Sequence, residues 1–130
     1  MVIGFKPQFV SKILDGTKLN TIREDKNNRW KKGVKMHMAT GVRTKNYSQF
    51  SEKVCKNVAK ISILWTGCNV KIIIDSVQIC NFNTAMHWSE HSNNGFRTLE
   101  TFAKRDGFDD LESFLKWFQK DFEGKVIYWE

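Results

Sequence analysis

The chain has 130 residues and a mass of 15.2 kDa, which fits one domain, and its 41% hydrophobic residues can fill one core. No apolar run approaches the roughly 18 to 20 residues of a membrane span, and the amino end lacks the features of a secretory signal. We therefore expect a soluble cytoplasmic protein without a membrane partner. Cys55, Cys68 and Cys80 form no CxxC pair, so we expect reduced thiols and neither metal nor cofactor.

The formal net charge of +7 suggests a polyanionic partner. Residues 1–97 carry 16 of the 21 Lys and Arg but only 6 of the 14 acids, whereas residues 98–130 carry 5 bases and 8 acids. We therefore do not expect the acidic end to form the surface that meets a polyanion.

The first part of the chain predicts a short strand, Val2–Phe5, and then a helix that begins near Pro7. Apolar residues recur at helical spacing from Phe9 to Leu14, and Gly16 is placed as a C-terminal stop. A basic turn at Arg29–Gly33 precedes a predicted strand, Val34–Ala39.

The polar stretch from Gly41 to about Asn57 predicts a mobile cationic loop. Two β-rich runs follow, Val58–Trp65 and Val70–Cys80, joined by the hairpin signal Thr66-Gly67-Cys68-Asn69.

Two helices, about Thr98–Arg105 and Asp109–Phe122, and a final strand, Lys125–Trp129, complete the prediction. Asp109 and Glu112 suggest a capping box for the second helix. Because strands mostly precede and flank the helices, the order favours an α+β fold: an antiparallel or mixed β-barrel with flanking helices.

The segment "GTKLNTIR", residues 16–23, sets Lys18, Thr21 and Arg23 directly after the first predicted helix. With the "RWKKG" turn and the later "AKRDGF" segment, it resembles the ASCH family of PUA-like domains, whose mark is G-x-K-x-x-x-x-R. The resemblance covers nearly the whole chain. It implies a small PUA-like β-barrel with a cleft beside the motif, and RNA or nucleoside ligands, with some members cleaving RNA.

One branch of small ASCH proteins is particularly similar: amidohydrolases that remove the acetyl group from N4-acetylcytidine. Their motif, G-x-K-x-x-T-x-R, places the catalytic Lys and Thr on Lys18 and Thr21. Their catalytic Glu corresponds to Asp106, which is about one methylene shorter.

These residues have a chemical logic of their own. A lysine whose pKa is lowered by burial and by a neighbouring cation such as Arg23 can act as a base, and Thr21 would then be the nucleophile. Asp106 would orient Lys18 or carry a proton to the leaving amine, without a metal. In the plainer interpretation, Thr21 is a strand residue and Lys18 and Arg23 are solvated or paired with acids.

Further ligand-binding candidates are aromatic and cationic residues, because nucleobases are held by stacking as well as by charge. They are Trp30, Lys32, Arg43, Lys45 and Tyr47, with Trp65 or Trp88 as further stacking candidates. His87 and His91 lack a convincing third metal ligand, His37 fits a strand, and Asp75 either points into a cleft or faces outward. A binding module, an amidohydrolase and a ribonuclease remain open.

Overall fold

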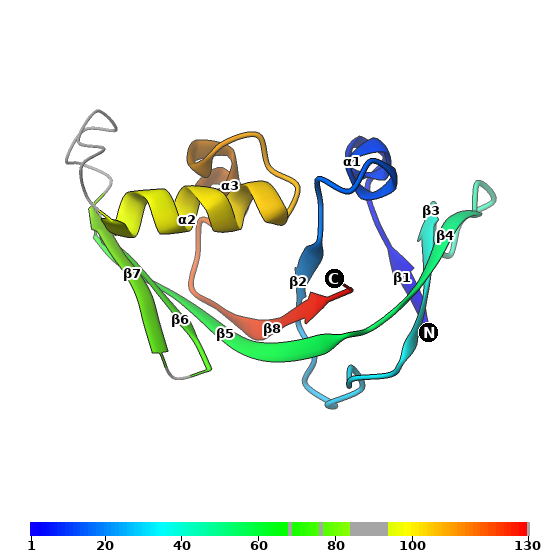
Figure 1. Cartoon of the computed structure of the whole chain (residues 1–130), viewed down its shortest axis with the longest axis horizontal. Helices are drawn as coiled ribbons and strands as arrows, with labels where there is room; N and C mark the ends of the chain where they lie inside the picture. The colour runs from blue at the N-terminus through cyan, green and yellow to red at the C-terminus, as the bar shows by residue number, and fades with distance from the viewer. Residues whose placement is uncertain (68, 76, 84–93, 130) are drawn as a thin grey trace.

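A computed structural model describes residues 1–67, 69–75, 77–83 and 94–129. Its strands form two sheets, mostly antiparallel, which confirms the predicted α+β class (Figure 1). Among the described residues the strands do not close into a barrel. No helix in this part of the chain has the length and apolar character to cross a membrane.

The smaller sheet has the order β1-β3-β4, with β1 (Val2–Gly4) parallel to β3 (Lys35–Thr40) and β4 (Ser48–Val54) antiparallel to it. The prediction of a loop from Gly41 to Asn57 is therefore wrong over β4. This strand lies at a sheet edge and exposes most of its side chains, so the apolar alternation that marks a half-buried strand is weak.

The larger sheet has the order β2-β8-β5-β6-β7. Its strands are β2 (Asn20–Arg23), β8 (Phe122–Tyr128), β5 (Asn57–Thr66), β6 (Asn69–Ile74) and β7 (Val77–Asn83). Figure 1 shows β4 running on into β5 as one long curved segment, so the chain passes from one sheet to the other at this point.

The predicted single run Val70–Cys80 is divided into β6 and β7. Asp75 lies between them with a φ of 49°, a turn conformation that Asp tolerates better than most residues. Its carboxylate accepts a hydrogen bond from the Lys60 main chain at 2.8 Å and the residue is exposed, so it does not point into a cleft.

The first helix is confirmed as η1 (Pro7–Phe9) followed by α1 (Val10–Leu14). Gly16 has a φ of 86°, in the left-handed region that glycine adopts without strain, and it ends the helix as predicted.

The later helices differ at their ends from the prediction: they are α2 (Asn94–Arg105) and α3 (Leu111–Trp117). Asp110, not Asp109, caps α3 by accepting a hydrogen bond from the Ser113 main chain at 2.8 Å. The helix stops before Phe118, whose carbonyl accepts a hydrogen bond from the Trp65 indole, because the chain turns there toward β8. The final strand accordingly begins earlier than predicted, at Phe122.

Candidate functional site

The segment "GTKLNTIR" passes from the end of α1 into β2, which lies at the edge of the larger sheet. Lys18, Asn20 and Thr21 are buried, with exposed fractions of 2%, 1% and 4%. Charged and polar side chains are rarely this deeply buried without partners, so their hydrogen bonds decide what the segment does.

Asp106 is also buried and comes from the junction between α2 and α3, opposite β2. Lys18 Nζ donates hydrogen bonds to the main-chain carbonyls of Asn20, at 2.8 Å, and of Asp106. The ammonium lies 3.7 Å from the Asp106 carboxylate, too far for a hydrogen bond. The carboxylate instead accepts one from Asn20 Nδ2 at 2.9 Å.

Gly107, next to Asp106, has a reason to be glycine. Its φ is 97°, and a Cβ there would lie 2.8 Å from the Lys18 side chain and 3.0 Å from the Phe9 ring. The absence of a side chain lets the α2–α3 junction approach the motif closely enough for Lys18 to reach Asp106.

Burial disfavours the charged form of both partners. It lowers the pKa of Lys18, and the nearby Arg23 guanidinium lowers it further, while the Asp106 carboxylate opposes both effects. Burial also raises the pKa of Asp106, against the attraction of Lys18 and Arg23. Both groups therefore change protonation state more readily near neutral pH than solvated Lys and Asp side chains do.

Arg23 lies at the end of β2 and links the two sheets. Its guanidinium donates to the Gly4 carbonyl of β1 at 2.5 Å and, more weakly, to Thr21 Oγ at 3.3 Å. It also lies over the Phe5 ring, 4.9 Å from the centroid. These contacts fix the Thr21 hydroxyl and the guanidinium on the same side of β2.

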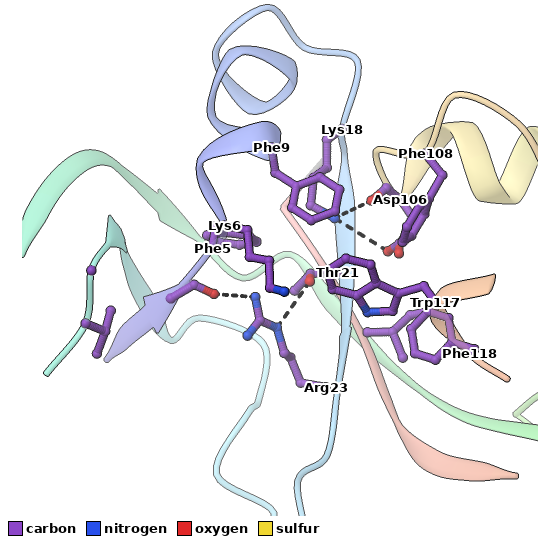
Figure 2. A pocket seen from close by; sticks show the side chains of 14 residues that line it. Phe5, Lys6, Phe9, Lys18, Thr21, Arg23, Asp106, Phe108, Trp117 and Phe118 are labelled. Carbon is purple, nitrogen blue, oxygen red and sulfur yellow. Dashed lines mark hydrogen bonds and ion pairs between the residues drawn. The ribbon is translucent and has the colours of Figure 1, made fainter. Parts of the chain in front are cut away.

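A cavity of about 350 Å³ opens beside these groups. Lys18, Thr21, Arg23 and Asp106 all line it, so four of the residues selected from the sequence lie together (Figure 2). Its other lining residues are mainly aromatic or come from the β1 and β3–β4 segments: Gly4, Phe5, Lys6, Phe9, Ile22, Gly41, Val42, Phe108, Trp117 and Phe118.

Sequence reasoning missed the aromatic wall. Phe9 and Phe108 meet edge to face at 5.6 Å, and Trp117 contacts both rings in the same way. Lys6 Nζ lies 4.9 Å from the Trp117 centroid. The available signal was that Phe108 belongs to the "AKRDGF" segment, next to Asp106.

The remaining ligand-binding candidates do not line the cavity. Trp30 packs against the core, and Lys32 is exposed in the turn that precedes β3. Arg43, Lys45 and Tyr47 are exposed in the β3–β4 connection, the same connection that supplies Gly41 and Val42 to the cavity wall.

The other candidates have separate places in the fold. Trp65 packs against the core, and its indole donates to the Phe118 carbonyl at 2.9 Å. His37 lies on β3, 3.5 Å from the Glu52 carboxylate. Cys55 is a buried thiol. His87, Trp88 and His91 lie outside the described residues.

The arrangement limits the chemistry of the cavity. Among the interactions drawn in Figure 2, Lys18 Nζ reaches Asp106 but not Thr21, whose hydroxyl is hydrogen-bonded to Arg23. A neutral lysine amine could keep its two carbonyl partners and direct its lone pair elsewhere. Proton transfer from Thr21 would therefore need a small movement of either side chain.

A scan against protein-family models, a search of curated proteins and a search of solved structures found no match to this chain.

Proposed function

We propose that this chain is an ASCH-type domain with a PUA-like fold, and that its cavity binds a nucleobase of RNA or of a modified nucleoside. One observation carries the proposal: the G-x-K-x-x-T-x-R residues and Asp106 gather at one cavity that has aromatic walls. Its volume of about 350 Å³ lies within the range of small-ligand pockets.

The lining suits a planar heterocycle. The exposed Trp117 ring offers a surface for stacking beside the buried Phe5 and Phe9 rings, while Thr21 and Asp106 offer polar groups for in-plane hydrogen bonds. Lys6 and Arg23 add positive charge, which would attract a phosphate or ribose-linked phosphate near the cavity.

RNA is favoured over a free nucleoside by the exposed cations of the β3–β4 connection. Arg43 and Lys45 lie in the connection whose Gly41 and Val42 line the cavity, so a strand that places one base inside could extend past them. A free nucleoside would give these cations no role.

The test is a titration of the protein with a short single-stranded RNA at several salt concentrations. Affinity should fall steeply as salt rises, because phosphate contacts release counterions. Arg23→Gln should weaken binding by about tenfold or more, as expected for one charged hydrogen-bonding partner. Lys32→Gln is the matched control, since Lys32 is exposed and does not line the cavity. Equal affinity of both variants and the native protein would refute a role for the cavity.

An amidohydrolase acting on N4-acetylcytidine is the second candidate. It is favoured by the buried Lys18, whose pKa is lowered by its surroundings, in the same cavity as Thr21 and an acid. The native protein should then release acetate from N4-acetylcytidine, and Lys18→Ala and Thr21→Ala should each abolish turnover. Turnover that survives in Thr21→Ala would exclude that residue as the nucleophile, and intact RNA after incubation would count against a ribonuclease.

A further inference from the structure

β2 is an edge strand of the larger sheet, and Thr21, Ile22 and Arg23 of this strand line the cavity. Among the described strands, β2 pairs only with β8. The Trp129 main chain donates to the Leu19 carbonyl, so this carbonyl faces β8, while the Leu19 N–H, which precedes the strand, donates to the Arg105 carbonyl. Asn20 faces the opposite way, because its carbonyl accepts from the Lys18 side chain.

Main-chain groups alternate between the two sides along an antiparallel strand. Thr21 and Arg23 therefore direct their N–H and C=O groups toward β8, and Ile22 directs both of its groups away from the sheet. Within the described part of the chain, no hydrogen bond outside the ladder uses Ile22 N–H or C=O.

Ile22 is among the residues that line the cavity, and because its side chain belongs to the core cluster, we expect its main chain to be the part that reaches the cavity. The side chain of Ile22 is buried in the core. Because side chains alternate along a strand, Thr21 and Arg23, which also line the cavity, project from the opposite face. A buried peptide group without a partner is unfavourable, so the cavity presents a donor and an acceptor side by side that a ligand can satisfy.

We propose that the main-chain N–H and C=O of Ile22 read the hydrogen-bonding edge of the ligand's heterocycle. The ligand class is a ring with an acceptor and a donor next to each other, as on the pairing edge of a nucleobase. For cytosine, Ile22 N–H donates to ring N3, and the exocyclic amino group donates to the Ile22 carbonyl. This inference rests on the proposed nucleobase-binding function and assigns its specificity to the backbone.

A base bound at Ile22 also lies at a defined distance from the polar groups around Lys18. Residues two apart on a strand are separated by roughly 7 Å, so a base held at Ile22 lies about that far from the Asn20 carbonyl where Lys18 is bound. Because the N–H of Ile22 precedes its C=O along the strand, the exocyclic nitrogen lies on the Arg23 side of ring N3, and a substituent on it extends away from Lys18.

The experiment compares cytidine with 3-deazacytidine, in which a C–H group replaces ring N3. The native protein should bind cytidine about tenfold more tightly, because the analogue leaves the Ile22 N–H without an acceptor. Replacing Ile22 with its α-hydroxy acid puts an ester in place of that amide and keeps the side chain. In this variant the preference for cytidine should disappear, and in the control Ile22→Val it should persist.

The outcomes separate the two proposals. If the native protein binds cytidine and 3-deazacytidine equally well, the proposed hydrogen bonds from Ile22 to the base are refuted, but the binding function is not. The same holds if the ester variant keeps the preference for cytidine. Failure of the native protein to bind cytidine, 3-deazacytidine and RNA would overturn the proposed function and this inference together.

Amide hydrogen exchange of the ligand-free protein gives a further check. The Ile22 amide should exchange faster than the Thr21 and Arg23 amides, which are bonded to β8. Equal protection of all three amides would overturn the proposal even before a ligand is added.

Discussion

Two Lys–Asp pairs of this protein have the same chemical composition and different environments. Lys125 lies 3.0 Å from Asp25, whose carboxylate also accepts hydrogen bonds from the main chains of Arg29 and Trp30. Lys18 lies 3.7 Å from Asp106, and its ammonium donates to main-chain carbonyls instead.

The hydrogen bonds decide which pair is held in its charged form. Burial disfavours ionisation of Asp25, but the main-chain N–H donors and Lys125 outweigh it and keep the pKa of Asp25 below its usual value. Asp106 has one amide donor, Asn20, and burial raises its pKa. The Asp25 pair thus fixes a turn, whereas the Asp106 pair is poised to exchange protons within a cavity.

The largest expected effect comes from removing Lys18. Lys18→Met leaves Asp106 buried without its cation, so the free energy of unfolding at neutral pH should fall by about 3 to 5 kcal/mol. Urea denaturation measures this change. Adding Asp106→Asn to Lys18→Met should recover part of the loss, and a loss below about 1 kcal/mol in the single variant would show that the pair contributes little.

The pH dependence of stability should have opposite signs at the two pairs. A carboxyl group whose pKa is raised on folding, such as Asp106, contributes stability below its usual pKa of 3.8 and loses it as the pH rises toward about 7. The stability of the native protein relative to Asp106→Asn should therefore decrease over this range, by at most about 1.4 kcal/mol per pH unit.

Asp25→Asn is the matched control for that measurement. Because folding lowers the pKa of Asp25, its contribution is present above pH 3.8 and is lost as the pH falls through the folded-state pKa. The native protein should thus lose stability relative to Asp25→Asn only in acid. The same sign of pH dependence at both positions would refute the contrast between the pairs.

The smallest expected effect comes from removing Lys125. After Lys125→Met, Asp25 still accepts from two main-chain N–H groups, so the loss in unfolding free energy should be about 1.5 to 3 kcal/mol, as for one hydrogen bond to a charged group. Thermal unfolding of the variant measures this loss. RNA binding by the same variant is the control, because an unchanged affinity shows that the cavity is unchanged. A loss as large as that in Lys18→Met would mean that the environment does not distinguish the two pairs.

Local patterns predicted much of the fold. The helix after Pro7, its end at Gly16, the strand that becomes β3 and the α+β class follow from periodicity, turn residues and element order. The prediction missed β4 because this exposed edge strand lacks an apolar alternation. It missed the turn at Asp75 because this turn lies within a run of apolar residues that looks like one strand.

By itself, the sequence determined which residues were available for a site: the "GTKLNTIR" segment after a helix, and the acid of "AKRDGF". Only the tertiary structure decided that Asp106 lies against Lys18, that Phe9, Phe108 and Trp117 form one wall, and that Ile22 is among the residues lining the cavity. The physical reason is that local propensity acts over a few residues, whereas the contacts of Asp106 with Lys18 and of Phe108 with Phe9 join residues at least 88 positions apart.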